Sequence, residues 1–491
     1  EFTQSPDETT ADLSALYASA GAVSPDFTKD KTDYTITVPF GTAEFSISAQ
    51  AENPYLEPVL LPAGGSGGSL LDADLMSAEN GGPLPEGSSR YEITVSAGDK
   101  SAEKTYSINV ICLPDLSLKT FQVTKDDFVR DLAPLDTQSV YLPYSGGVTV
   151  VAEAGNDGAL VSYSPSPTIS KIIATAPATV TVTVSKSVNG EAYSKDYVLN
   201  LYYGAGMNSD PLASGGYVSF IPSDDKDANY YYEVHTFPNA GTYMLLFDPI
   251  PVGPVVADYL IVAGGGGAGG GLWWGGGGGG GAGGLLYQPE QTLTLTDGSV
   301  PVAVGKGGNG GSGNNTGSDG EPSSIGDVTV SGGGGGGAGH DSNSNPPGNS
   351  GGSGGGGGVG YNYHSGKAGS STASGGVMGN PGGDGSMHMA GGGGGGGAGS
   401  AGKSKDNGGA GGDPWSPDNG PAWIKDVTGA DQFSRGGNGG HNSGVGTGAA
   451  GLNYGDGGAG GGLYRSPGGA GHSGIVIVRF QRESAAAPAE P

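Results

Sequence analysis

The stretch DYLIVAGGGGAGGG, residues 258–271, decides the fold of this chain. Apolar residues with high strand propensity, Tyr259 to Val262, run directly into glycines. A strand that opens into G-x-G-x-x-G is also how a dinucleotide-binding fold begins, where a helix follows the glycines and offers its N–H groups to a phosphate. The residues after the glycines therefore decide between a nucleotide site and a different use of glycine.

The residues that follow exclude the nucleotide site. GLWWGGGGGGGAGG (271–284) holds ten glycines in fourteen residues, and each glycine costs a helix roughly 1 kcal/mol relative to alanine. GAGSAGKS (397–404) fits the P-loop pattern, but glycine runs stand where that motif needs a strand before it and a helix after it. No nucleophile elbow is present either, so we expect no enzymatic activity.

The glycines are concentrated in the second half of the chain. Only 20 of the 104 glycines fall in residues 1–250, so the first half has an ordinary composition. Acidic residues outnumber basic ones by 48 to 21, which gives a net charge of −27. This charge repels phosphate backbones, so we expect no nucleic-acid partner. No stretch is long and apolar enough for membrane insertion, and the single cysteine, Cys112, excludes an internal disulfide.

Three structures are open to such a glycine array: a flexible linker, a collagen-like triple helix and a lattice of packed polyglycine helices. Collagen needs glycine strictly at every third position, and the long glycine runs break that rule. A linker does not need apolar segments at both ends, as YLIVA and GIVIVRF (474–480) provide here. We therefore expect polyglycine-II rods that bond to one another laterally. The tracts suited to rods are 264–271, 275–284, 332–339, 351–358, 391–399 and 457–462.

The first half of the chain reads as short strands separated by loops rich in glycine and proline. DYTITVP (33–39), RYEITVSAG (90–98) and KTYSINV (104–110) alternate apolar and polar residues at period two. Short strands at this spacing favour a β-sandwich.

Part of this region resembles the cadherin-like β-sandwich module of bacterial surface proteins. The matching residues are Leu13, Leu16, Gly21, Pro25, Phe27, Tyr34 and Tyr106. The resemblance implies a sandwich over residues 1–112, without a need for calcium, because the acidic linker motifs of true cadherins are missing. A second, divergent copy without a clear S-P-x-F is expected over residues 113–203, from LPDLSLKTF to KDYVLNLYY. In both copies a tyrosine-centred strand closes the module.

A second resemblance covers about residues 215–480. The opening stretch, the upstream YEVHTFPNAGTYML (232–245) and the closing SGIVIVRF (473–480) resemble the glycine-rich domain of bacterial surface proteins and phage tail-fibre adhesins. The resemblance implies a sandwich of polyglycine-II rods, with receptor contacts made by the loops between rods.

These patterns together predict an all-β chain. Two β-sandwich domains of the immunoglobulin or cadherin-like type precede a glycine-rich domain of packed polyglycine-II helices framed by strands. The expected boundaries are 1–112, 113–203 and 204–482, with a tail at 483–491.

Side chains other than glycine gather between the rods, and the aromatic ones are the candidates for binding or subunit contact. They are Tyr361, Tyr363, His364, Trp415, Trp423 and Phe433. Two roles are open for them: contact with a receptor or a neighbouring subunit, or coverage of exposed glycine backbone. Trp415 with Asp413 and Asp418 has the elements of a glycan platform. The histidines are scattered singly and lack zinc-site spacing, so we expect no metal and no cofactor.

The expected function is that of a non-enzymatic, secreted protein of the cell surface. The first hypothesis is an extracellular structural protein that assembles with copies of itself into a filament, sheath or appendage. The alternative is an adhesin that recognises a surface glycan or protein receptor through its loops. A more distant alternative is an ice-binding protein, which would need faces of small residues.

Overall fold

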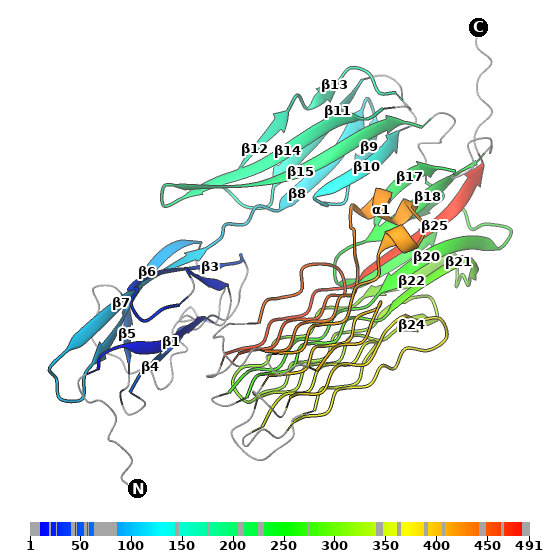
Figure 1. The fold of residues 1–491 in the computed structure, drawn as a ribbon. Helices are drawn as coiled ribbons and strands as arrows, with labels where there is room; N and C mark the ends of the chain where they lie inside the picture. Colours follow the sequence, from blue (N-terminus) through cyan, green and yellow to red (C-terminus); the bar gives the residue numbers. More distant parts are fainter. Residues whose placement is uncertain are drawn as a thin grey trace.

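The computed structural model shows an all-β chain arranged as two sandwiches and a larger glycine-rich domain (Figure 1). The structure describes residues 10–483 except 19–20, 26, 41–44, 46, 54–55, 57, 63–85, 143–146, 174–175, 205–210, 224–229, 273–274, 340–346, 361–364, 387–390, 405–407, 441–447 and 463–465.

The first sandwich contains a two-stranded and a five-stranded sheet. The two-stranded sheet pairs β1 (Leu13–Ala18) with β4 (Ile47–Ala51). The five-stranded sheet has the order β2 (Ala22–Ser24), β3 (Asp33–Val38), β7 (Glu103–Cys112), β6 (Gly87–Ser96) and β5 (Val59–Pro62). Tyr106 of the closing strand is fully buried, and its hydroxyl accepts the Leu13 N–H at 3.0 Å. This tyrosine thus fastens the last strand to the first.

The second sandwich shares part of the strand order of the first. One sheet has the order β10 (Thr137–Leu142), β15 (Glu191–Tyr203), β14 (Ala178–Val188) and β12 (Leu160–Ser164). The other has β13 (Thr168–Ile169), β11 (Val148–Ala154), β8 (Leu118–Lys125) and β9 (Phe128–Asp131). Strands β10, β15, β14 and β12 stand in the places of β3, β7, β6 and β5, but β9 pairs with β8 in the other sheet. As in the first sandwich, the third strand pairs in parallel with the closing strand. The hydroxyl of Tyr197 on β15 donates to the Leu116 carbonyl at 2.9 Å.

A polar joint connects the two sandwiches. Glu86 accepts the Asp115 N–H at 3.0 Å and the Asn156 side-chain amide at 2.6 Å, and it pairs with Lys186. Lys186 lies near the tip of the β14–β15 hairpin, which reaches back to the start of β6 (Figure 1). Contacts from the hairpin, a loop and the linker thus meet at one carboxylate between the two sandwiches.

Two five-stranded sheets form the frame of the glycine-rich domain. The inner sheet has the order β17 (Tyr217–Pro222), β18 (Tyr230–Phe237), β25 (Ile475–Glu483), β20 (Val255–Val262) and β21 (Leu285–Leu293). The outer sheet has β16 (Ala213–Ser214), β19 (Gly241–Phe247), β22 (Ser299–Val304), β23 (Ser323–Ile325) and β24 (Val328–Val330). The strand before the first glycines pairs with the strand after the last ones, β20 with β25, so the two apolar segments that bound the array belong to one sheet. Both faces of β25 are buried, one against each hydrophobic cluster of the domain.

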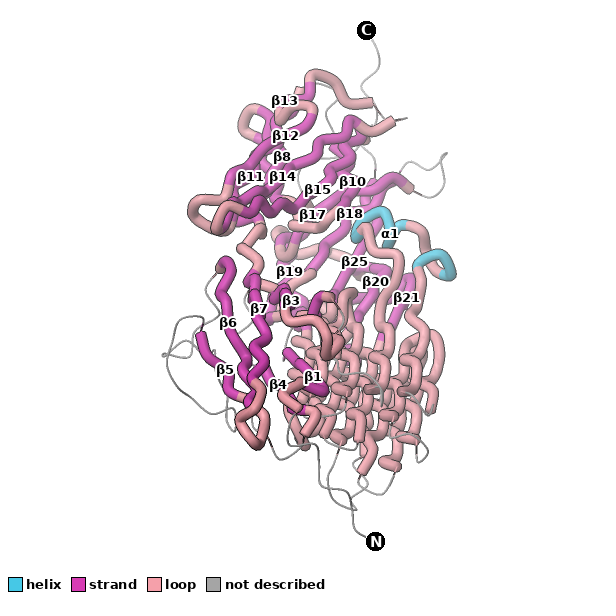
Figure 2. The backbone as a smooth tube through the Cα atoms, turned by 60° about the vertical axis from the view of Figure 1, so that its left-hand side comes forward, coloured by secondary structure: helices cyan, strands magenta, loops and turns pink. Residues whose placement is uncertain are grey.

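The glycine tracts between the frame strands form a prism of extended rods (Figure 2). The predicted tracts lie in its interior, where their glycines are buried apart from Gly399. In the first rod, successive N–H groups point to different neighbours: Gly264 donates to Glu321, Gly265 to His472 and Gly266 to Gly281. Every third residue returns to the same neighbour because polyglycine II has about three residues per turn. The packed polyglycine helices expected from the sequence are therefore confirmed.

Close backbone contact explains why these positions are glycine. A Cβ atom on Gly266 would lie 2.3 Å from the Gly334 carbonyl oxygen, and one on Gly264 would lie 2.0 Å from that of Lys306. At the perimeter of the prism, side chains occur at every third position, where they point outward. Two neighbouring rods show the pattern with Lys306, Asn309 and Ser312, and with Asn315, Ser318 and Glu321, all of them exposed.

Candidate functional site

The rods of the prism alternate in direction, so the connections between them gather at its two ends. Gly266 bonds to Gly281 and Gly269 to Gly278, which makes the first two rods antiparallel. The same alternation continues to the last rod, which enters β25 at Gly474. We call the end at the strands the frame end and the opposite end the free end.

The free end collects a connection from each pair of rods. The described residues that mark it are bonded to one another: Gly271 to Ser466, Gly277 to Gly461, Gly339 to Gly270 and Ser386 to Gly391. The sequence segments that join rods here are centred on 273, 313, 343, 362, 388, 406, 444 and 464. Many segments distant in the sequence thus leave the lattice at one end, which is the arrangement expected of a composite binding surface.

For one group of the candidate residues, the structure describes only the residues on either side. Tyr361, Tyr363 and His364 lie outside the described residues. The residues on either side of them, Val359 and Ser365, form an antiparallel bridge, and Val359 donates to Gly276 at the free end.

The other candidates lie at the frame end, and two of them are not on the surface. Trp423 is 2% exposed and Phe433 is fully buried, so the expectation that they contact a receptor or subunit is corrected. They belong to a long connection that crosses the inner sheet and contains a short helix, α1 (Trp423–Thr428). Their rings pack on Leu260 and Ile477 and complete the second hydrophobic cluster of the domain. They therefore pack with side chains of the inner sheet, and not on exposed glycine backbone as the second of the two roles left open by the sequence would require.

Charge and aromatic contacts hold this connection on the sheet. The Arg479 guanidinium lies 4.5 Å from the centre of the Trp423 ring and pairs with Asp258 at 2.8 Å. Phe433 stacks on Tyr454 with 6.3 Å between ring centres. Burial raises the pKa of Tyr454 to about 12, so its hydroxyl stays protonated at any physiological pH. The burial of these aromatic side chains is that of a hydrophobic core and not of a binding surface.

Trp415, suggested by its neighbours as a glycan platform, is half-buried and packs against other residues of the connection. A Cβ atom on Gly420 would lie 2.4 Å from the Trp415 ring, and Phe433 packs against that ring with 6.0 Å between ring centres. The Asp413 carboxylate accepts the Ser400 hydroxyl at 2.8 Å, while Asp418 is exposed and reaches Lys425. A sugar ring needs an open aromatic face, and here both the ring and one carboxylate are already engaged.

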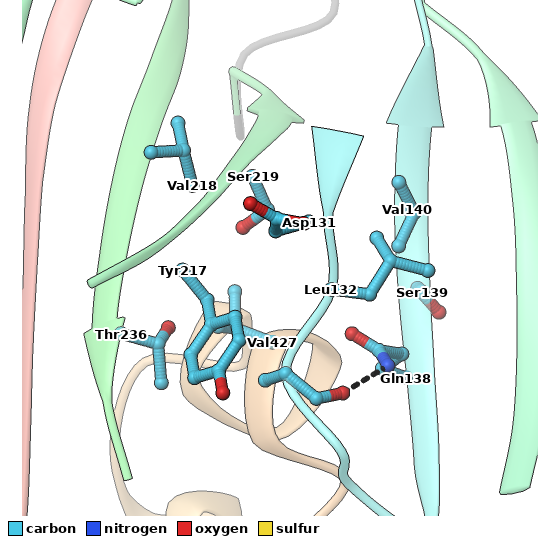
Figure 3. Close-up of a pocket in the computed structure, with 11 residues that line it drawn as sticks. Asp131, Leu132, Gln138, Ser139, Val140, Tyr217, Val218, Ser219, Thr236 and Val427 are labelled. Carbon is cyan, nitrogen blue, oxygen red and sulfur yellow. Dashed lines mark hydrogen bonds between the residues drawn. The ribbon is translucent and has the colours of Figure 1, made fainter. Parts of the chain in front are cut away.

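A narrow crevice lies between the second sandwich and the frame (Figure 3). Asp131, Gln138 and Ser139 line it from the sandwich, and Tyr217 and Thr236 line it from the frame. The Gln138 amide donates to the Ala133 carbonyl at 2.6 Å, so the amide is used to hold its own loop. We read the crevice as the seam of a domain contact.

Metal-binding clusters and reactive side chains are the other kinds of chemical site that the described residues could form. Among the described residues, no cluster of three or more histidine, cysteine, aspartate or glutamate side chains could hold a metal ion. Cys112 is buried, and burial raises the pKa of its thiol. His235 is buried and lies 3.0 Å from the Glu233 carboxylate.

The sequence analysis missed one surface, the outward side of β19. Met244 and Leu246 are 41% and 46% exposed there, although both are large apolar residues. The signal available in the sequence was the alternation of GTYMLLF, in which both alternating sets of positions contain apolar residues.

Comparison with known families identifies two parts of the chain. Residues 11–111 match the family model of a cadherin-like beta sandwich domain, and residues 240–481 match that of a glycine-rich domain. The suspected architecture is thereby confirmed, and it fits a surface or adhesion-type protein. No curated protein matches the chain. Cadherin-like domains are typical of extracellular proteins, and no helix among the described residues is long and apolar enough to cross a membrane.

Proposed function

We propose that this chain, a cadherin-like sandwich followed by a glycine-rich domain, is a non-enzymatic extracellular adhesin. In this proposal the frame and its lattice form a rigid base, and the free end of the prism carries the loops that bind a surface glycan or protein. The observation that carries the proposal is that described residues flanking rod connections distant in the sequence lie side by side at the free end. The lattice supplies a rigid base, which reduces the entropy lost when loops bind.

The proposal divides the aromatic candidates between two tasks. Tyr361 and Tyr363 stand in the sequence between Val359 and Ser365, which lie at the free end, and they are the candidates for ligand contact. Trp423 and Phe433 support the frame end from within the core. Tyrosine suits a binding loop because its ring offers apolar area and its hydroxyl offers a hydrogen bond.

Binding to a printed array of oligosaccharides and extracellular-matrix proteins tests this function. We expect the full chain to bind a subset of the array, and the double variant Tyr361→Ser/Tyr363→Ser to lose about tenfold or more in affinity. Leu452→Ser is the matched control, because Leu452 is 84% exposed but lies at the frame end. No binding to the array, or equal loss in the control, contradicts the proposal.

Self-assembly into an extracellular filament or sheath is the second candidate. The observation in its favour is the exposed apolar surface on β19, since such surfaces mark contacts with other proteins. Electron microscopy of the purified chain separates the candidates: regular polymers favour assembly, and dispersed single molecules favour the adhesin.

A further inference from the structure

A lysine, an asparagine and a glutamate contact one another at the joint between the two sandwiches. The Lys186 amine donates to the Asn156 side-chain carbonyl at 2.8 Å and pairs with one carboxylate oxygen of Glu86. The Asn156 amide nitrogen donates to the other oxygen of Glu86 at 2.6 Å. Each side chain thus contacts both of the others, and we call these three residues the amide triad.

Strand register brings two members of the amide triad together. β12 and β14 pair in antiparallel with Leu160 opposite Ser185, so residue 186 lies beside the turn that leads from Asn156 into β12. Lys186 also continues the inward register of β14. The preceding inward residues, all fully buried, are Val180, Val182 and Val184. A lysine rarely follows a row of core residues unless its amine has partners, and here the amine reaches the amide and the carboxylate.

The carboxylate of the amide triad comes from the other sandwich. Glu86 directly precedes β6 and also accepts the N–H of Asp115 in the linker at 3.0 Å. A Cβ atom on Gly87 would lie 2.6 Å from the Asn189 amide nitrogen, so the hairpin packs closely on the start of β6. The Lys186 and Glu86 side chains are only 16% and 18% exposed, and most of the surrounding water is therefore displaced.

We propose that the amide triad joins Lys186 to Asn156 through a covalent amide bond. The Lys186 nitrogen attacks the side-chain carbonyl carbon of Asn156, which forms the new carbon–nitrogen bond. The bond from this carbon to the Asn156 amide nitrogen then breaks, and that nitrogen leaves as ammonia. One amide replaces another, so the reaction needs no oxidant, reductant or cofactor. The proposal is independent of ligand binding at the free end and goes beyond it.

Glu86 moves the protons that this exchange requires, because its two oxygens contact the two nitrogens involved. The carboxylate takes one proton from the Lys186 ammonium and leaves an amine that can attack. The resulting carboxylic acid protonates the Asn156 amide nitrogen as its bond to carbon breaks, and it then receives the second proton of the attacking nitrogen. Ammonia carries this last proton away as ammonium, which restores the Glu86 carboxylate.

The reaction needs to occur only once in each molecule. Burial acts to raise the pKa of Glu86, but hydrogen bonds from Lys186 and from the Asp115 N–H lower it by more, so the pKa lies below its usual value. The ion pair is therefore the resting state, and the first proton transfer limits the rate. Groups held in contact react as if they were at very high concentration, which offsets this step.

The bond links the turn between β11 and β12 to the β14–β15 hairpin across 30 residues of chain. A cross-link stabilises a domain by restricting its unfolded chain. Because Glu86 belongs to the first sandwich, the bond forms only after the two sandwiches have docked.

Intact-mass spectrometry of the full chain tests the bond. We expect the wild type to be lighter than its sequence mass by one molecule of ammonia, and a protease digest to contain a branched peptide that joins Lys186 to Asn156. Lys186→Arg and Glu86→Gln are expected to keep the full mass, because the first lacks the nucleophile and the second lacks the proton acceptor. Lys195→Arg is the matched control: Lys195 also pairs with a carboxylate, that of Asp136 at 3.0 Å, and the variant should still lose ammonia.

The outcomes separate the bond from an ordinary ion pair and from side reactions of asparagine. A wild type of full mass contains an ion pair only and overturns the proposal. Cyclisation of an asparagine onto its own backbone also releases ammonia, so a loss that persists in Lys186→Arg, or one without the branched peptide, overturns it as well. Asn156→Ala, expected to keep its full mass, is the second variant if Lys186→Arg does not fold. A branched peptide in Glu86→Gln overturns the role given to Glu86.

Discussion

At the scale of the residue, the interior of the prism depends on the absence of a single carbon atom. Gly266 accepts from Gly458 and donates to Gly281, and no space is left on its remaining side. Polyglycine rods approach closely enough for direct N–H to carbonyl bonds only when no Cβ atom separates them. The entropy lost in ordering so many glycines is thus balanced by bonds that no other residue permits.

Gly266→Ala tests this dependence. The added methyl would lie 2.3 Å from a carbonyl oxygen of the neighbouring rod, so we expect the free energy of unfolding to fall by about 3 kcal/mol. Gly253→Ala is the control, because a Cβ atom there meets nothing within 4 Å. Chemical denaturation of both variants gives the comparison, and an unchanged stability of Gly266→Ala contradicts the packed lattice.

At the scale of the element, a buried polar cluster anchors the short strand β16 to the frame. Glu233 on β18 accepts the N–H groups of Leu212 and Ala213 at 2.8 and 3.0 Å, and it pairs with His235 and Arg482. Burial alone raises the pKa of Glu233, but the His235 hydrogen bond and charge and the backbone N–H groups outweigh it, so the pKa lies below 4.5. The carboxylate is therefore stabilised in its charged form.

The stability of this anchor depends on pH in a predictable direction. Because the pKa of Glu233 is lower in the folded chain, its contribution is complete above pH 4.5 and is lost as the pH falls through the folded value. We expect Glu233→Gln to lower the free energy of unfolding by about 3 kcal/mol at neutral pH and to reduce its decline below pH 4.5. Denaturation at several pH values tests this, with the exposed Glu153→Gln as control.

The elements also show what sequence can and cannot predict here. The rods followed from the glycine runs, and the apolar segments at both ends of the array indicated strands, but the direct pairing of β20 with β25 comes from the structure alone. The place of Trp423 did not, because an aromatic residue between glycine tracts suits a binding loop and a core equally well. Its side chain lies at the frame end because of the direction of the preceding rod. That direction depends on the number of rods that precede it. The ends of individual rods cannot be located in a glycine-rich sequence, so this number cannot be counted from it.

At the scale of the whole molecule, side-chain contacts join the second sandwich to the frame of the glycine-rich domain. Tyr141 of the second sandwich packs into both frame clusters that face it, and Arg130 lies 4.6 Å from the centre of the Phe220 ring. These contacts could not be read from the sequence, because they join strands whose own sandwiches already satisfy the alternation of apolar and polar residues. Together with the joint at Glu86, they set the direction in which the prism points.

Glu86→Ala tests the joint between the sandwiches. The change removes the acceptor for Asp115, Asn156 and Lys186, so we expect a wider distribution of shapes and a larger radius of gyration in small-angle X-ray scattering. The unfolding of each sandwich should change little, because the carboxylate is not part of either core. Glu103→Ala, an exposed change in the same sandwich, should leave the scattering unaltered.

The period of the rods also governs how this domain can change its length. Deleting one residue from a rod turns every later position by about 120°, so that side chains such as Lys306 would face the lattice and glycines would face water. Insertions and deletions within a rod therefore keep side chains outward and glycines inward only when their length is a multiple of three residues. A change in the length of a free-end connection does not rotate the residues of the rods. Natural variation in length is therefore expected in these connections, while the lengths of the rods change only by three residues at a time.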